Sequence, residues 1–226
     1  MVDAGACELH LGGQQLWLMP QRAVWWPAQQ ALLLADVHIG KATSFRRLGV
    51  PVPAGTTDDT LQRLDALIAR CGAQHLIVLG DLFHSEHVQA SGSLDAFAEW
   101  RLARNGLRIT LIRGNHDHRS GDPSDALNIG CVDAPADLGG LAGLHEPDAR
   151  FTGPAIAGHV HPAIRLQGRG RDRLRLPCFV LQGQQLTVPA FGAFTGMHTL
   201  SDLHGLRVFA VTGEKVFAIP GSIATG

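Results

Sequence analysis

The chain has 226 residues, of which 45% are hydrophobic and 17% charged, so a disordered polypeptide is excluded and one substantial core is expected. A formal net charge of −1 gives no overall attraction to nucleic acid or to an anionic membrane. No apolar run approaches the roughly 18 residues of a membrane helix, and the start of the chain lacks the basic and apolar regions of a signal peptide. We therefore expect a single cytoplasmic domain over residues 1–226.

Strand-like segments open the chain, at residues 7–11, 15–19, 23–26 and 31–35, and Gly12-Gly13 is typical of a hairpin turn. Leucines with helical spacing predict a helix over 57–71, with Thr56 or Thr57 as its cap and Gly72 at its end. Buried strands are expected within 75–81 and 107–117, on either side of a second helix at about 92–104. Short runs punctuated by Gly and Pro predict β-hairpins from about residue 163.

The β-α-β-α-β order of the first half predicts helices packed on a largely parallel sheet. The four cysteines are Cys7, Cys71, Cys131 and Cys178. They are scattered without paired spacing, which predicts reduced and mostly buried thiols of a cytosolic protein.

Histidine and oxygen-bearing side chains follow five apolar segments in turn. The series comprises Asp36 and His38; Asp81 and His84; Asn115 and His116; His145; and finally His159 and His161. The carboxyl ends of strands in open α/β sheets are where ligands bind. Alternate residues of an extended segment point the same way, so the D-x-H and H-x-H spacings could aim two donors at one centre. Adjacent glycines permit sharp turns and close approach.

These donors are imidazoles, carboxylates and an amide, with no cysteine among them. Such a set favours a site for a divalent ion such as Mn²⁺, Fe²⁺ or Zn²⁺ with nitrogen and oxygen ligands, rather than a zinc site with cysteine ligands. Two ions about 3.5–4 Å apart can share a hydroxide and clamp a phosphoryl group for in-line displacement. Each motif alone is weak, because a lone Asp-x-His is usually a loop or a helix cap, and a lone GNHD can be a turn.

In this order, the motifs DVH, GDLFH, GNHD, LHE and GHVH over residues 36–161 resemble the calcineurin-like metallophosphoesterase superfamily. The resemblance implies an α/β (α+β in some schemes) metallo-dependent phosphatase fold, a two-sheet β-sandwich flanked by helices. It implies that one metal is held by Asp36, His38 and His161, and a second by Asn115, His145 and His159. Asp81 would bridge the two ions. His116 would face the substrate as general acid, assisted by His84.

The stretches ADVHIGKATSFRRLGVPVPAGTT and LPCFVL…VPAFGAFTG resemble the bacterial DNA-ligase-associated metallophosphoesterases. That resemblance implies a metal-dependent phosphodiesterase, a DNA-repair endonuclease using two divalent ions, with Mn²⁺ favoured over Fe²⁺, Zn²⁺ or Ni²⁺. It implies DNA as substrate and a functional association with an ATP-dependent DNA ligase and a helicase. No membrane is expected as a partner. A phosphomonoesterase or nucleotide pyrophosphatase on the same site is the alternative, and a non-enzymatic scaffold is a third class.

Two local features stay open at this point. The segment RLQGRGRDRLR, residues 165–175, contains five arginines and one acid, so it could grip a nucleic-acid backbone or be an ordinary solvated hairpin. Asp117 could orient a neighbour or simply cap the next turn. The missing GDxxDRG sequence, common in phosphomonoesterase branches of the superfamily, favours diesters.

Overall fold

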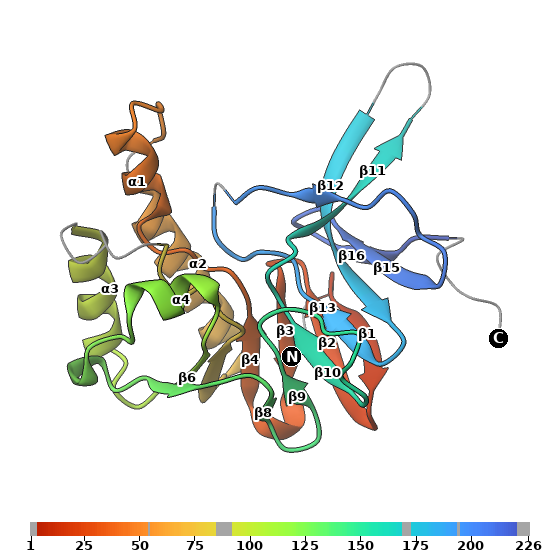
Figure 1. Ribbon diagram of the computed structural model, residues 1–226, viewed down its shortest axis with the longest axis horizontal. Coiled ribbons are helices and arrows are strands. Elements are labelled where there is room, and N and C mark those ends of the chain that lie inside the picture. Colours follow the sequence, from red (N-terminus) through yellow and green to blue (C-terminus); the bar gives the residue numbers. More distant parts are fainter. Residues whose placement is uncertain (1–3, 54, 85–91, 169–172, 194, 221–226) are drawn as a thin grey trace.

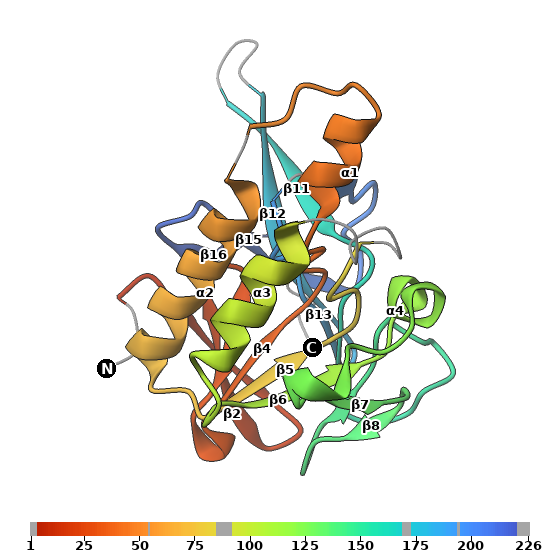
Figure 2. The ribbon, with the colours of Figure 1, turned by 90° about the vertical axis from the view of Figure 1, so that its left-hand side faces the viewer.

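The computed structural model describes residues 4–53, 55–84, 92–168, 173–193 and 195–220. Within these residues the chain forms two mixed β-sheets packed face to face, with helices against the outer face of the first (Figures 1 and 2). This is the α/β architecture of the metallo-dependent phosphatase fold, as the sequence predicts. None of the helices in the described ranges is long and apolar enough to cross a membrane.

The first sheet has seven strands in sequence order. They are β1 (Cys7–Leu11), β2 (Gln14–Met19), β3 (Ala23–Trp26), β4 (Ala31–Leu34), β5 (His75–Val78), β6 (Arg108–Ile112) and β7 (Gly130–Val132). Strands β1 to β4 pair antiparallel, and β4 to β7 pair parallel. The predicted turn at Gly12-Gly13 is confirmed, because both residues have positive φ (56° and 76°) between paired Leu11 and Gln14.

The second sheet has nine strands among the described residues, in the order β14-β11-β12-β13-β10-β9-β8, with β15 beside β12 and β16 beside β15. Their bounds are β8 (Ala136–Asp137), β9 (Ala142–Gly143), β10 (Ala155–Ala157), β11 (Pro162–Gln167), β12 (Arg173–Gln182), β13 (Gln185–Thr187), β14 (His198–Thr199), β15 (Leu206–Val211) and β16 (Val216–Ala218). The hairpins predicted for the last third of the chain are confirmed.

The α-helices are α1 (Lys41–Arg47), α2 (Thr56–Cys71), α3 (Gly92–Leu102) and α4 (Asn115–Ser120), with short 3-10 turns at Pro27–Gln29 and Asp125–Leu127. Figure 2 shows α2 and α3 side by side over the first sheet. The predicted threonine cap of α2 is wrong, because Gly55 occupies the cap position and Thr56 donates its hydroxyl hydrogen bond to Pro53 O instead. Gly72 ends α2 in the left-handed conformation, as predicted.

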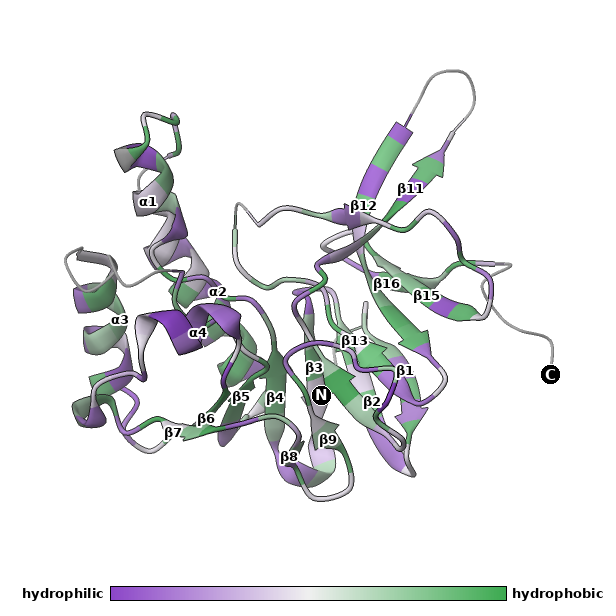
Figure 3. Cartoon of the chain, viewed as in Figure 1, coloured by the Kyte–Doolittle hydropathy of each residue, from purple (hydrophilic) through white to green (hydrophobic). Residues whose placement is uncertain are grey.

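Two cores lie on opposite faces of the first sheet, because alternate residues of its central strands point to opposite sides. Leu32 and Leu34 of β4 pack under α2 and α3, whereas Leu33 packs against the second sheet. Strand β4 is apolar along its whole length (Figure 3), as a strand covered on both faces must be. One of these cores lies between the two sheets, and the single domain expected over residues 1–226 stays a prediction.

The cysteines are free thiols, as expected, but the expectation that they are mostly buried is wrong. Only Cys178 is buried, within the second sheet, and burial raises its pKa to about 12. The other three are partly exposed: Cys7 begins β1, Cys71 ends α2, and Cys131 lies in β7 at the edge of the first sheet.

Candidate metal centre

The residues predicted from the sequence meet at the edge of the first sheet where the parallel strands end. The loops after β4 and β5 run alongside each other, with hydrogen bonds from Asp36 N to Gly80 O (3.1 Å) and from His38 N to Asp81 O (3.0 Å). The loop after β6 begins α4, and the loops after β9 and β10 carry the remaining histidines to the same edge. Five strand ends therefore converge, as predicted.

Two groups of three side chains have potential ligand atoms within 4.8 Å of one another. They are Asp36, His38 and His161, and Asp81, His145 and His159. Asp81 also approaches the first group: its Oδ2 is 4.0 Å from His38 Nε2, while its Oδ1 is 3.7 Å from His145 Nε2 of its own group. Each oxygen of this one carboxylate thus faces a different group.

Backbone carbonyls fix the proton on three of the imidazole rings. Nδ1 donates to Leu79 O in His145 (3.0 Å), to Gly196 O in His161 (3.0 Å) and to His84 O in His116 (2.8 Å). Because a carbonyl oxygen only accepts, each Nδ1 carries a hydrogen, and Nε2 of the neutral ring presents its lone pair to the site. This arrangement is typical of metal-binding histidines, whose other nitrogen is held by a hydrogen-bond acceptor.

Acceptor atoms converge at the site. Because Nδ1 of His145 donates to Leu79 O, its Nε2 is an acceptor, and it lies 3.0 Å from the acceptor Asn115 Oδ1. The same Nε2 lies 3.0 Å from His159 Nδ1, which donates to it when that nitrogen carries the hydrogen. His161 Nε2 lies 3.2 Å from Asp36 Oδ1, which has no hydrogen-bond partner among the described residues, whereas Oδ2 accepts from His159 N (2.9 Å). Two acceptors this close repel each other unless a proton or a metal ion lies between them.

The burial of the two carboxylates adds to the need for a compensating positive charge. Asp36 is fully buried and Asp81 is 2% exposed, and a buried carboxylate is costly without a compensating charge. Burial, followed by the charges of Lys41 and neighbouring histidines, lowers the pKa of His38 to about 2, so its ring is neutral at physiological pH and free to ligate. The donors are nitrogen and oxygen without sulfur. The residues present therefore fit divalent ions of the borderline-to-hard class.

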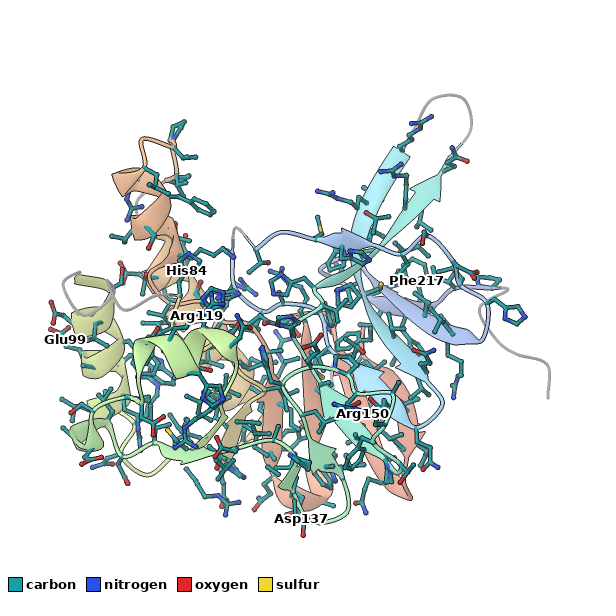
Figure 4. The ribbon with its side chains drawn as sticks, viewed as in Figure 1. His84, Glu99, Arg119, Asp137, Arg150 and Phe217 are labelled. Atoms are coloured by element: carbon teal, nitrogen blue, oxygen red, sulfur yellow. The ribbon has the colours of Figure 1, made fainter. Side chains whose placement is uncertain are left out.

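His84 and His116 lie beside this centre. Their rings stack with centroids 5.3 Å apart, and with His38 they form a third group whose ligand atoms lie within 4.8 Å. In Figure 4 His84 lies between α1 and α4. Burial, then Lys41 and His116, lowers its pKa to about 4. The contact between the two residues that the resemblance implies is made by the backbone, because His116 Nδ1 donates to the carbonyl oxygen of His84 and not to its ring.

Comparisons with known proteins agree with this geometry. Residues 30–172 match the sequence profile of the calcineurin-like phosphoesterases. The chain belongs to the calcineurin-like phosphoesterase family. The crystal structure of Pseudomonas putida nuclease MPE is similar over 95% of this chain and 100% of that one, with 42% identity and a TM-score of 0.83.

A second solved structure is more distant. Yfce, a phosphoesterase from E. coli, is 17% identical over 82% of this chain and 95% of its own, with a TM-score of 0.39. A comparison with curated protein sequences found no match.

The backbone at the candidate ligands differs from the expectation. Five of them, Asp36, His38, Asp81, His159 and His161, have φ between 50° and 68°. The prediction that the D-x-H and H-x-H spacings work through an extended segment is therefore wrong. Left-handed backbone costs a non-glycine residue on the order of 1–3 kcal/mol, and such strain gathers at functional sites. It turns each loop sharply enough for both side chains of a motif to reach the centre.

Asn115 and His116 were also expected in an extended segment, and that expectation is wrong as well. They are the first two residues of α4. Successive residues point about 100° apart around a helix, so their side chains still diverge. Asn115 Oδ1 contacts His145, whereas His116 Nε2 lies 3.9 Å from Asp81 Oδ2.

Asp117 does both things that the sequence left open. Its Oδ2 accepts from Gly114 N (2.9 Å), which caps α4, and from Asp81 N (2.7 Å), while Oδ1 accepts from Leu82 N (3.1 Å). The carboxylate thus holds the loop after β5 against the start of α4. Burial raises the pKa of Asp117, and the three backbone N–H groups oppose that rise. An acid at the third position of a helix was the available sequence signal.

Glycines before two motifs make room for His145, as their presence suggested. A Cβ on Gly80 would lie 2.0 Å from His145 Nδ1, and Gly80 has a φ of 87°. A Cβ on Gly114 would lie 2.3 Å from Asp81 Oδ1 and 2.7 Å from His145 Cε1. Neither position accepts a side chain without moving a candidate ligand.

Residues 190–192 lie within the stretch that resembles the ligase-associated subfamily, but no sequence pattern predicts that they support the site. They pair with the residues directly after β4, on the side away from Gly80. Phe191 N donates to Ala35 O (2.9 Å) and Gly192 N to Asp36 O (3.0 Å). Arg63 Nη2 in turn donates to Phe191 O (3.1 Å). This segment therefore supports the backbone that presents Asp36.

Proposed function

We propose that the protein is a divalent-metal-dependent phosphodiesterase that cleaves nucleic acid. The observation that supports this most is the position of Asp81, with one carboxylate oxygen toward each group of donors. One ion would be held by Asp36, His38 and His161, the other by Asn115, His145 and His159, with Asp81 shared. Two divalent ions held there would supply an activated water and positive charge to neutralise the phosphate. Mn²⁺ suits these donors, and Fe²⁺, Zn²⁺ and Ni²⁺ are its competitors.

His116 is proposed as the general acid for the leaving oxygen. Its Nδ1 is committed to the carbonyl of His84, so only Nε2 can exchange a proton with a substrate. The His116 side chain is 29% exposed, whereas that of Asp81 is 3% exposed, so a substrate can reach the former. When both nitrogens carry hydrogen, Nε2 gives its proton to the leaving alkoxide and the ring returns to the neutral form. His84 positions this ring.

The preference for diesters rests on two observations. The chain lacks GDxxDRG, and the structure it matches at 42% identity is that of a nuclease. DNA as substrate, a role in DNA repair, a cytoplasmic location and an association with a ligase and a helicase remain proposals from the subfamily resemblance. A scaffold role alone is disfavoured, because every candidate ligand position is filled and brought to one edge.

The test is a comparison of bis(p-nitrophenyl) phosphate with p-nitrophenyl phosphate, each with Mn²⁺, Fe²⁺, Zn²⁺, Ni²⁺ or Mg²⁺. We expect the diester to be hydrolysed with the higher kcat/KM, and Mn²⁺ to give the highest rate. Single-stranded DNA, duplex DNA and RNA then define the natural class of diester. A higher kcat/KM on the monoester would reject the proposal in favour of the phosphomonoesterase alternative.

A further inference from the structure

Strands β11 and β12 continue beyond the two sheets as a two-stranded ribbon (Figure 1). Their register places Arg165 opposite Arg175, Leu166 opposite Leu174, and Gln167 opposite Arg173. Because side chains alternate along a strand, the three arginines share one face and the leucines share the other. We call the first face, made by Arg165, Arg173 and Arg175, the arginine face. Arg169 and Arg171 lie outside the described residues.

The arginine face lies on the same side of β12 as the residues that pack against the first sheet. Along β12, Phe179 and Leu181 pack in the core between the two sheets. Arg173 and Arg175 are an even number of residues away, so they point to the same side of the strand. Leu176 and Cys178 point to the opposite side of β12 and pack on the outer side of the second sheet. The arginine face therefore continues the surface that meets the first sheet. Figures 1 and 2 show the ribbon and α1 rising at the same end of the molecule.

The ribbon begins at the candidate metal centre. Strand β11 starts at Pro162, directly after His161. Arg165 is four residues beyond His161, which is about 13 Å along an extended strand. At the 3.4 Å rise of stacked nucleic acid this is about four nucleotides, and fewer for an extended strand.

Nothing in the described part of the chain neutralises the arginine face. Arg165, Arg173 and Arg175 are exposed, and no ion pair or hydrogen bond joins them to any described residue. Like charges directly opposite each other destabilise a strand pair, so Arg165 and Arg175 work against the ribbon that carries them. Arginine forms bidentate hydrogen bonds with phosphate, and a row of phosphates would remove this repulsion.

We propose that the arginine face binds the sugar–phosphate backbone of a nucleic-acid strand whose scissile bond lies at the metal centre. The inference rests on the proposed function and deepens it, because it names how the substrate is held outside the reacting groups. A small diester never reaches the ribbon. The contribution of the arginine face is therefore confined to substrates several nucleotides long.

The test compares R165Q/R175Q with the charge-matched control R70Q/R108Q. Arg70 lies in the last turn of α2 and Arg108 begins β6, so both are exposed at the opposite ends of these elements from the candidate metal centre. Binding of oligothymidylate and oligouridylate is measured in EDTA at several salt concentrations, which removes turnover from the readout. Each phosphate contact on a single strand contributes about 0.7 to the salt slope, so R165Q/R175Q should lose about 1.4. Between 50 and 200 mM salt its affinity should then fall about sevenfold less than that of the wild type.

The control should keep the wild-type slope, and both oligonucleotides should respond alike if the backbone phosphate is recognised. An unchanged slope in R165Q/R175Q, a loss equal to that of the control, or a loss confined to one sugar type would overturn the inference. Hydrolysis of bis(p-nitrophenyl) phosphate should be unchanged in both variants. If the wild type fails to hydrolyse that diester, the proposed function fails, while the binding comparison still decides the arginine face on its own.

Discussion

Asp117→Asn removes one acceptor from the carboxylate that joins the loop after β5 to the start of α4. The side chain is 2% exposed and accepts three backbone hydrogen bonds, from Asp81 N, Gly114 N and Leu82 N. An amide that keeps its oxygen at the Oδ2 position retains the first two bonds. Its NH₂ group then faces the N–H of Leu82, where neither partner can accept.

The expected magnitude follows from this count. A hydrogen bond to a charged group contributes about 1.5–3 kcal/mol, and a buried donor left unsatisfied costs about 1–3 kcal/mol. Because the two retained bonds also lose their charge assistance, we expect the free energy of unfolding to fall by about 2–4 kcal/mol. That is a large share of the roughly 5–15 kcal/mol of a typical domain.

Urea denaturation of the metal-free protein measures this change as a lower midpoint at an unchanged m-value. The control is Asp122→Asn, the same chemical change in an exposed ion pair with Arg113, which should cost at most about 1 kcal/mol. Because Asp117 holds the loop that carries Asp81, metal affinity should also fall, by about 10–100-fold. A loss for Asp117→Asn below about 0.5 kcal/mol, or one equal to that of the control, would refute the assigned role.

Two further pairs of substitutions test the centre itself. His116→Asn should retain its metals but lose about 10²–10⁴-fold in DNA cleavage, with a much smaller loss on bis(p-nitrophenyl) phosphate, whose leaving group needs no proton. His38→Asn should lose metal and both activities together; metal depletion in His116→Asn with equal losses on both substrates would make His116 a ligand. Gly80→Ala forces a methyl group into the His145 ring and should displace an ion from that side of Asp81. Gly72→Ala, also at positive φ but in open space, should cost only about 1–2 kcal/mol of stability and leave metal content unchanged, and equal metal content in the two variants would contradict the packing argument.

Much of this architecture can be predicted from the sequence, because apolar runs that end in Asp, Asn or His indicate the strands that lead to the candidate metal centre. Strands β1 to β6 of the first sheet and the order of the candidate ligands were predicted from the sequence, whereas β7 (Gly130–Val132) was not. Local pattern does not reveal the backbone between them. The left-handed conformations at Asp36, His38 and Asp81 depend on hydrogen bonds between loops that are about 45 residues apart in the chain, such as Asp36 N to Gly80 O.

Long-range contacts explain the other differences. The role of Asp117 depends on three N–H groups, two of which belong to a loop about 35 residues earlier. Phe191 supports Asp36 from a segment about 155 residues away, and no spacing rule links the two. The arginines of residues 165–175 were visible as composition. Only the register of β11 with β12 shows that Arg165 and Arg175 share one face of the ribbon.

The most direct measurement of the central claim is the metal content of the wild type and of Asp81→Ala, determined by elemental analysis after reconstitution with Mn²⁺. If Asp81 is shared between two ions, the wild type should approach two ions per chain, and the variant should be impaired at both sites. His161→Ala should impair the ion on one side of Asp81 only. Near-full occupancy of both sites in Asp81→Ala, or a wild type that saturates at one ion per chain, would contradict the shared dinuclear centre.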